Sequence, residues 1–137
     1  MRDWSGQDPD DALLQITRRF LAAHGPATRE DYARWWAMTP AAAGALLERL
    51  GDEATPVEDD GTAAWLLTAH AGEVEAAVPS RAVRLLPAFD QYVVAATRHA
   101  RGLLPGDLAG RVYRAQGWLS PVLLVAGRMD GIWRYER

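Results

Sequence analysis

The stretch from Thr28 to Leu67 constrains the fold of this chain more than any other part of it. Thr28 is a favourable helix N-cap, and the two acidic residues in the turn after it favour a short helix that ends near Ala37. Thr39-Pro40 then starts another helix at once, because threonine caps helices and proline suits the first helical position. We expect this next helix to end at Leu50. Two helices joined by so short a turn predict a helix-turn-helix.

A β-hairpin is predicted directly after this helix pair. Residues 55–58 and 62–67 flank Asp59-Asp60-Gly61, and Asp-Gly is a strong hairpin signal. An earlier helix, from about Pro9 to Ala23, ends at Gly25-Pro26. Three helices followed by a hairpin predict a winged helix-turn-helix, which makes DNA binding the first hypothesis to test. Helical spacing places these residues in its core: Leu13, Ile16, Phe20, Leu21, Tyr32, one or both of Trp35 and Trp36, Ala43, Leu46, Leu47 and Leu50.

The second half of the chain consists of short apolar runs separated by turns. Pro121–Val125 and Met129–Tyr135 flank the turn Ala126–Arg128 and predict a second β-hairpin. The runs Val83–Leu86 and Tyr92–Ala95 are further candidate strands. Several short strands close together predict a small, partly open, barrel-like sheet.

The sequence therefore predicts an α+β protein with two domains. We expect a winged helix-turn-helix in residues 1–78 and a small β-rich region in residues 79–137. The boundary is placed at Ala76–Ser80, where small residues and a proline interrupt the pattern.

Charge is distributed unevenly along the 137 residues, whose formal net charge is −3. Residues 1–80 carry six arginines against fourteen acidic side chains, a net −8, whereas residues 81–137 carry nine against four, a net +5. The chain has no lysine. Arginine suits bidentate phosphate contacts, although we favour GC-rich coding as the reason for this usage. A polyanion should be attracted to the second half and repelled by the first.

Composition excludes several kinds of site. The absence of cysteine excludes disulfides, thiolate metal sites and cysteine nucleophiles. His24, His70 and His99 show no metal-ligand spacing, so we expect no metal and no cofactor. No apolar run reaches the roughly 18 residues that a membrane helix needs, and the N-terminus is acidic, unlike a signal peptide. A soluble, cytoplasmic protein that does not bind membranes is expected.

The predicted reading helix lacks the side chains that normally read DNA. Its exposed positions are Ala41, Ala42, Ala45 and Glu48, where arginine, asparagine, glutamine or serine would be expected. Arg49 is the only basic residue there, and Thr39 is the only capping hydroxyl. The hairpin tip adds three carboxylates at residues 58–60, which would repel phosphate. We therefore interpret the motif as a scaffold rather than a DNA reader.

Arginines alternate with aromatic residues in the second half, a pattern that suits phosphate neutralisation and stacking on exposed bases. The aromatic residues are Tyr113, Trp118, Trp133 and Tyr135. The alternative places the aromatic rings in the core and the arginines on a solvated face. We favour the core for Trp118 and Trp133, and a DNA surface for the arginines. The predicted DNA-binding residues are Arg98, Arg101, Arg111, Arg114, Arg128 and Arg134.

Asp90 and Gln91 form the one candidate polar site on an apolar turn. A carboxylate there could position water for hydrolysis, or it could accept backbone N–H groups in the turn. We favour the turn role, because no second acid or base stands at a recognisable spacing.

Three separated blocks of sequence resemble one known family. They are Arg19–Thr28 with Asp31 and Trp35-Trp36, then Arg84–Asp90, and finally Gln116–Val122 with Gly127–Trp133. In this order they resemble the C-terminal part of the winged-helix DNA-binding proteins of the AlkZ/YcaQ-like DNA glycosylase family.

The resemblance implies a longer protein, with tandem winged helices followed by a β-barrel-like C-terminal region. Since the members of the family are longer, this chain would be a natural short form or a fragment. Some members of the family excise alkylated bases or unhook DNA crosslinks. The family's catalytic element is a Q-x-Q or Q-x-D motif in the N-terminal part. The four glutamines here all lack that partner: Gln7, Gln15, Gln91 and Gln116. No catalytic residue is assigned, and whether the chain is an enzyme stays open.

The preferred interpretation is a DNA-binding or DNA-positioning module. It would contact duplex or damaged DNA mainly through the phosphate backbone and shape. The alternative is a protein–protein interaction or dimerisation module. In that case apolar surface on the winged helix would contact an N-terminal domain, a partner chain or a second copy.

Overall fold

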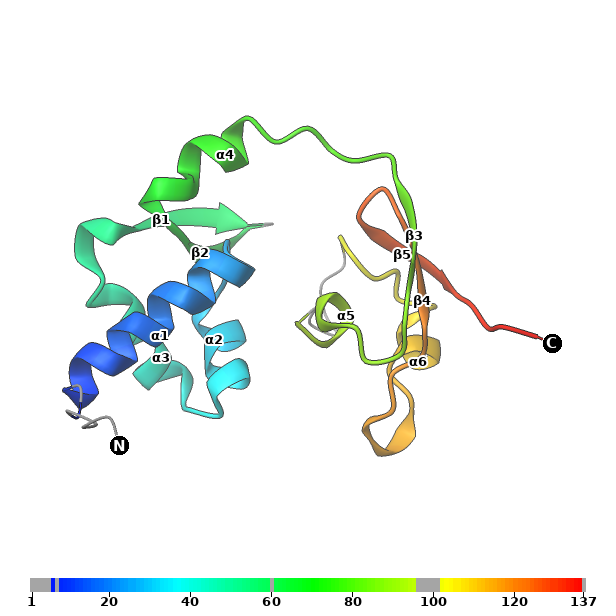
Figure 1. The fold of residues 1–137 in the computed structure, drawn as a ribbon, viewed down its shortest axis with the longest axis horizontal. Coiled ribbons are helices and arrows are strands. Elements are labelled where there is room, and N and C mark those ends of the chain that lie inside the picture. Colours follow the sequence, from blue (N-terminus) through cyan, green and yellow to red (C-terminus); the bar gives the residue numbers. More distant parts are fainter. Residues whose placement is uncertain (1–5, 7, 60, 96–101, 137) are drawn as a thin grey trace, which may run out of the picture. The chain divides into compact units, whose positions relative to one another are not determined.

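A computed structural model describes residue 6 and residues 8–59, 61–95 and 102–136 (Figure 1). The chain divides into two compact units, residues 1–77 and residues 78–137. Both contain helices and an antiparallel sheet, so the predicted α+β class is confirmed. Among the residues described, none of the helices is long and apolar enough to cross a membrane.

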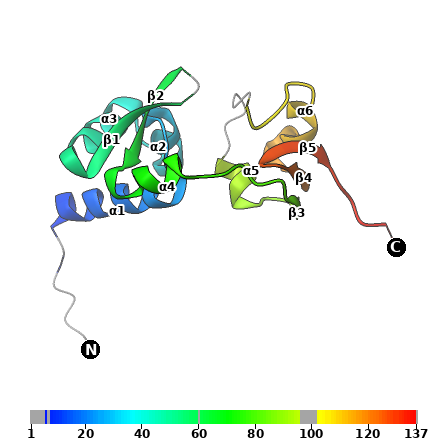
Figure 2. The same cartoon turned by 90° about the horizontal axis from the view of Figure 1, so that it is seen from above.

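The first unit has the element order of a winged helix-turn-helix. Its three main helices gather beside an antiparallel two-stranded hairpin (Figures 1 and 2). In chain order the elements are α1 (Pro9–His24), α2 (Arg29–Trp36), α3 (Pro40–Glu48), the 3₁₀ turn η1 (Gly51–Glu53), β1 (Ala54–Asp59), β2 (Thr62–Leu67), η2 (Thr68–His70) and α4 (Ala71–Glu75).

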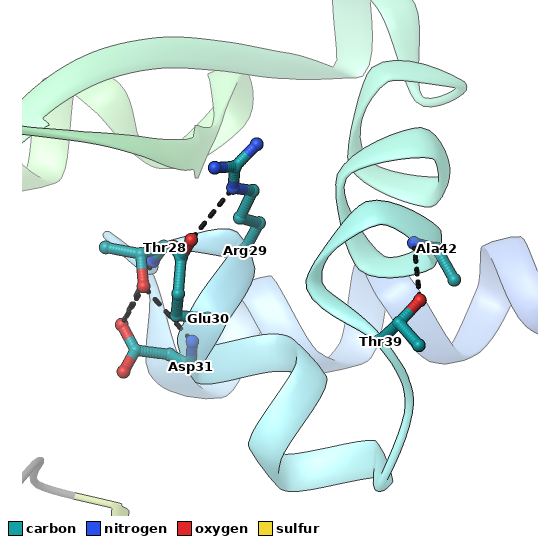
Figure 3. Close-up of polar contacts among 6 residues, drawn as sticks. All are labelled: Thr28, Arg29, Glu30, Asp31, Thr39 and Ala42. Carbon is teal, nitrogen blue, oxygen red and sulfur yellow. Dashed lines mark hydrogen bonds and ion pairs between the residues drawn. The ribbon is translucent and has the colours of Figure 1, made fainter.

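Two threonines set where α2 and α3 begin (Figure 3). Thr28 accepts a hydrogen bond on its Oγ1 from the backbone N–H of Asp31 at 3.1 Å, and the Asp31 carboxylate accepts one from the Thr28 N–H at 3.1 Å. This reciprocal pair is a capping box. Thr39 Oγ1 likewise accepts from the Ala42 N–H at 3.2 Å. Both helices therefore start where the sequence predicts.

The core of the first unit lies between the helices and the hairpin. The four predicted inward-facing residues of the α3 region, Ala43, Leu46, Leu47 and Leu50, are all buried. The other buried members of this core are Phe20, Leu21, Ala27, Tyr32, Ala33 and Ala54.

The expectation that Trp35 or Trp36 belongs to this core is wrong, since their exposed fractions are 47% and 42%. Tyr32 and Ala33 already occupy the buried face of the short helix α2. Trp35 lies at the edge of the core, with its ring 5.3 Å from that of Phe20. Trp36 stacks on Trp35, with ring centroids 5.5 Å apart.

The second unit contains a three-stranded antiparallel sheet of order β3-β4-β5. The predicted hairpin is confirmed: β4 and β5 are joined by Ala126 and Gly127, both at positive φ, and Asp130 forms a bulge in β5. The elements are β3 (Val83–Leu86), α5 (Gln91–Ala95), α6 (Ala109–Val112), the 3₁₀ turn η3 (Ala115–Gly117), β4 (Val122–Val125) and β5 (Arg128–Ile132).

The predicted strand Tyr92–Ala95 is instead part of helix α5. Only Val93 of this run is fully buried, and it joins residues of α6, β4 and β5 in one core. The apolar run therefore contributes a single inward side chain from a helix. The buried core residues of this unit are Val93, Leu104, Leu108, Val112, Leu119, Val122, Leu124 and Met129.

A buried hydrogen bond links α1 to α2 and gives the first testable prediction. Thr17 donates its hydroxyl hydrogen to the Leu13 carbonyl at 2.8 Å, so the Tyr32 hydroxyl, 2.8 Å away, donates to Thr17 Oγ1. Both side chains are fully buried. Tyr32→Phe removes one bond and should lower the free energy of unfolding by about 1 kcal/mol.

Thr17→Val serves as the comparison, because it leaves the Tyr32 hydroxyl buried without an acceptor and should cost about 1–3 kcal/mol. Chemical denaturation of both variants measures the two values. Equal stability of the wild type and both variants would show that this buried hydrogen bond contributes no net stability.

Candidate nucleic-acid interface

The arginines of the first unit are neutralised by nearby carboxylates. Four of the five that the structure describes there form ion pairs: Arg18 with Glu53 at 2.6 Å, Arg29 with Glu30 at 2.9 Å, Arg34 with Asp31 at 3.2 Å and Arg49 with Asp10 at 3.3 Å. Hydrogen bonding from Arg18 lowers the pKa of the Glu53 carboxyl below its ordinary value, and Arg29 does the same to Glu30. Little positive charge in this unit is available to a ligand.

The second unit has the opposite arrangement. Its described arginines are all exposed, and only Arg134 forms an ion pair with another described residue, Glu136. The arginines without such a pair among the described residues are Arg81, Arg84, Arg111, Arg114 and Arg128. Their guanidinium groups are therefore free to bind anions from solvent.

Four predicted DNA-binding arginines fall within the described residues. Arg111 is on α6 and Arg114 follows it within the same segment. Arg128 begins β5 and Arg134 lies two residues beyond its end, so at most about 20 Å of extended chain separates them. The predicted Arg98 and Arg101 lie outside the described residues.

A short loop between α6 and β4 is held closed by backbone hydrogen bonds. Arg114 donates its N–H to the Trp118 carbonyl at 2.8 Å, and Tyr113 and Leu119 form an antiparallel bridge. The buried Ser120 anchors the base of the loop, because its Oγ donates to the Arg111 carbonyl at 2.8 Å. Loop residues 114–118 are therefore presented on a fixed backbone.

The expectation that Trp118 is a core residue is wrong, since 53% of its surface is exposed. Leu119, its neighbour in the closed loop, takes the buried position, and Trp118 faces outward. Trp133 is half-buried and donates its indole N–H to the Leu86 carbonyl at 2.9 Å. Tyr113 is also half-buried and bonds through its hydroxyl to the Val93 carbonyl, whereas Tyr135 is 79% exposed.

Phe89 lies beside the exposed Trp118, although no sequence pattern marked it as a candidate. The residue is 46% exposed, and its ring meets that of Trp118 edge to face, with centroids 5.1 Å apart and an interplanar angle of 81°. The two residues are 29 positions apart in the chain. No local pattern in the sequence connects them, because only the fold brings the two turns together.

Asp90 is the N-cap of α5. Its Oδ1 accepts a hydrogen bond from the Tyr92 N–H at 2.9 Å, and its carbonyl accepts from the N–H groups of Val93 and Val94. Gln91, the first residue of the helix, is exposed. This geometry matches the turn role favoured from the sequence.

The predicted reading helix presents a small, apolar surface. Ala41, Ala42, Ala45 and Glu48 of α3 are exposed, as their spacing predicts. The described wing-tip residues Glu58 and Asp59 are exposed as well, while Asp60 lies outside the described residues.

Comparison with known proteins identifies the family of the chain. The profile of the family described as DNA glycosylase AlkZ-like matches residues 1–137. The chain belongs to the AlkZ-like DNA glycosylase family. The resemblance noted in the sequence is thereby confirmed.

Two matches, one to a protein sequence and one to a solved structure, come from Streptomyces sahachiroi. The chain is 36% identical to the interstrand DNA cross-link repair glycosylase of this organism over 135 residues. The matched region is 96% of this chain and 36% of that protein. The solved structure of the Streptomyces sahachiroi DNA glycosylase AlkZ matches with a TM-score of 0.86 and 35% identity, over 96% of this chain and 37% of that one. The chain thus spans little more than a third of these AlkZ-like relatives.

Substitution of Asp90 separates a capping role from a chemical one. Asp90→Ala removes the acceptor for the Tyr92 N–H and should lower the free energy of unfolding by about 0.5–2 kcal/mol. Asp90→Asn should retain the cap and the stability, because asparagine is an equally good N-cap. Thermal unfolding measures both. A hydrolytic role requires a different result, namely that Asp90→Asn abolishes cleavage of an N-glycosidic substrate that the wild type cleaves.

Proposed function

We propose that this chain is a DNA-binding or DNA-positioning module of the AlkZ-like family. The observation that carries the proposal is the contrast in arginine pairing. Carboxylates neutralise most described arginines of the first unit, whereas Arg111, Arg114 and Arg128 of the second unit have no ion-pair partner among the described residues. Unpaired, exposed arginines suit phosphate binding.

In this proposal, DNA is held mainly through its phosphate backbone and its shape. Each arginine that neutralises a phosphate releases a condensed counterion, which favours binding without reading sequence. The acidic first unit repels the same polyanion and so orients the module, with residues 78–137 toward duplex or damaged DNA. The helix-turn-helix, with alanines on its exposed face, would act as a scaffold.

We further propose that the two units are separate domains of a cytoplasmic protein and serve an active site formed elsewhere. The chain contains no Q-x-Q or Q-x-D triplet and spans 36% of a relative named for cross-link repair. The catalytic residues would then come from an N-terminal domain or a partner chain. The module would supply the DNA contacts that place the lesion there.

Binding of duplex DNA should depend steeply on salt. We expect fluorescence anisotropy to give measurable affinity at low salt, and Arg111→Ala with Arg114→Ala to reduce the slope of log K against log salt by about 2, one unit per lost phosphate contact. The matched control is Arg29→Ala with Arg34→Ala. Those arginines are similarly exposed but paired with Glu30 and Asp31, so the slope should not change.

Two outcomes would contradict phosphate binding by the second unit. One is a wild-type chain with no affinity for DNA at low salt. The other is an equal loss of affinity in the control double variant, which would show that total charge matters and the position of the arginine does not.

A second candidate function rests on an apolar hollow in the first unit. It has a volume of about 480 Å³ and is lined by Leu13, Trp36, Ala37, Met38, Ala42, Ala45, Leu46 and Arg49. Exposed apolar surface of this kind suits contact with another protein domain. The rival proposal is an interaction or dimerisation module that uses the winged helix as its scaffold.

Light scattering distinguishes this rival from the DNA-binding module. We expect a monomer at micromolar concentration. The rival requires a stable dimer or complex that Ala45→Arg disrupts, because that side chain lines the hollow. Ala41→Arg is the matched control, since Ala41 is exposed on the same helix but is not among the lining residues.

A further inference from the structure

An exposed aromatic pair in the second unit has no role in phosphate binding. Phe89 and Trp118 contact each other edge to face, and about half of each side chain remains open to solvent, 46% and 53%. In an edge-to-face pair the edge of one ring meets one face of the other, so the remaining ring faces are not covered by the partner ring. Aromatic surface is therefore available for a planar ligand to stack on.

Phe89 itself, and Gln116 in the loop that carries Trp118, adopt backbone conformations that cost energy. Phe89 has a φ of 59° and Gln116 a φ of 61°, and neither is glycine. Such positive φ values are uncommon for residues with side chains, and strained positions of this kind concentrate at ligand sites. The hydrogen bonds that close loop 114–118 hold the backbone of the loop before any ligand binds. Preorganisation of this kind reduces the entropy lost on binding.

The chemistry around Trp118 matches one class of ligand. A hollow of about 480 Å³, within the usual size of ligand sites, is lined by Arg114, Ala115, Gln116 and Trp118. It combines an aromatic ring, an amide that can both donate and accept hydrogen bonds, and a guanidinium without an ion-pair partner among the described residues. From Ala109 to Leu119 the charged residues are both arginines.

We propose that this hollow binds an unpaired nucleobase of DNA, with the base stacked on Trp118. The Gln116 amide hydrogen-bonds to the edge of the base, and Arg114 binds the adjacent phosphate. This site, the Trp118 stacking site, deepens the proposed DNA-binding function and rests on it. A peptide ligand fits less well, because the described site offers positive charge beside a ring but no long apolar groove.

A pair of oligonucleotides tests the stacking directly. The first is a single-stranded 12-mer of DNA with 2-aminopurine at its centre, and the second has an abasic position there, so that both carry the same phosphates. We expect the full chain to bind the 12-mer more tightly and to quench the 2-aminopurine fluorescence. Trp118→Ala should weaken binding of the 12-mer by about 5- to 150-fold, the range for loss of one stacked base, and leave binding of the abasic strand unchanged.

Two variants control for folding and for the mere loss of an aromatic side chain. Trp118→Phe keeps a stacking surface and should retain most of the affinity and quenching. Trp36→Ala removes an exposed aromatic side chain of the first unit and should bind both oligonucleotides as the wild type does. Circular dichroism melting of all variants identifies any that are unfolded, and if Trp118→Ala is among them, the difference between the two oligonucleotides with the wild type carries the test.

The outcomes separate this proposal from the phosphate-binding one. Salt-dependent affinity that is the same for both oligonucleotides, or that Trp118→Ala leaves unchanged, overturns base stacking while phosphate binding stands. Absence of any DNA affinity in the wild type overturns both. A dimer that Trp118→Ala dissociates, with no change in DNA affinity, assigns the aromatic pair to a protein interface and also overturns the proposal.

Discussion

The packing of the first unit depends on Ala27 and Thr28, the last two residues of the segment that joins α1 to α2. Ala27 exchanges two backbone hydrogen bonds with Trp65 of β2, at 3.0 Å and 2.9 Å, so the start of the second helix is tied to the hairpin. Thr28 then caps α2 through its reciprocal bonds with Asp31. Because α3 packs on α2, this junction positions the helices and the wing together. The buried Thr17–Tyr32 hydrogen bond adds a second link between α1 and α2.

The second unit uses backbone closure to present side chains outward. Ser120 and Leu119 are buried and anchor the loop between α6 and β4, which leaves Arg114 and Trp118 on the surface. A rigid loop on a small sheet is a common way to hold binding residues in place. The same unit carries the unpaired arginines, so the proposed phosphate contacts and the proposed stacking site lie on one compact unit.

The two units differ in whether their arginines are paired with carboxylates. In the first, arginines form exposed ion pairs, which contribute little stability but cancel much of the local charge. In the second, the arginines that the structure describes are all exposed, and only Arg134 is paired with another described residue. The chain belongs to the AlkZ-like DNA glycosylase family, and in the proposed function this asymmetry directs phosphate to the second unit.

Local signals in the sequence determined much of the fold. Thr28, Thr39 and Asp59-Asp60-Gly61 specified the helix starts and the first hairpin, because caps and turns depend on residues within one turn of each other. The inward-facing residues of α3 followed from helical spacing for the same reason. The charge asymmetry and the absence of cysteine were also fixed by sequence alone.

Tertiary structure decided the features that depend on distant residues. Periodicity could not show that Tyr32 and Ala33 fill the buried face of α2, leaving Trp35 and Trp36 exposed at its end. The run Tyr92–Ala95 has an apolar pattern that suits a strand, yet the Asp90 cap and the position of Val93 in the core make it a helix. Trp118 became a surface residue because Leu119 took the buried place, and it meets Phe89 only through the fold. Burial is a competition among all the side chains near one core, and a linear pattern does not contain its result.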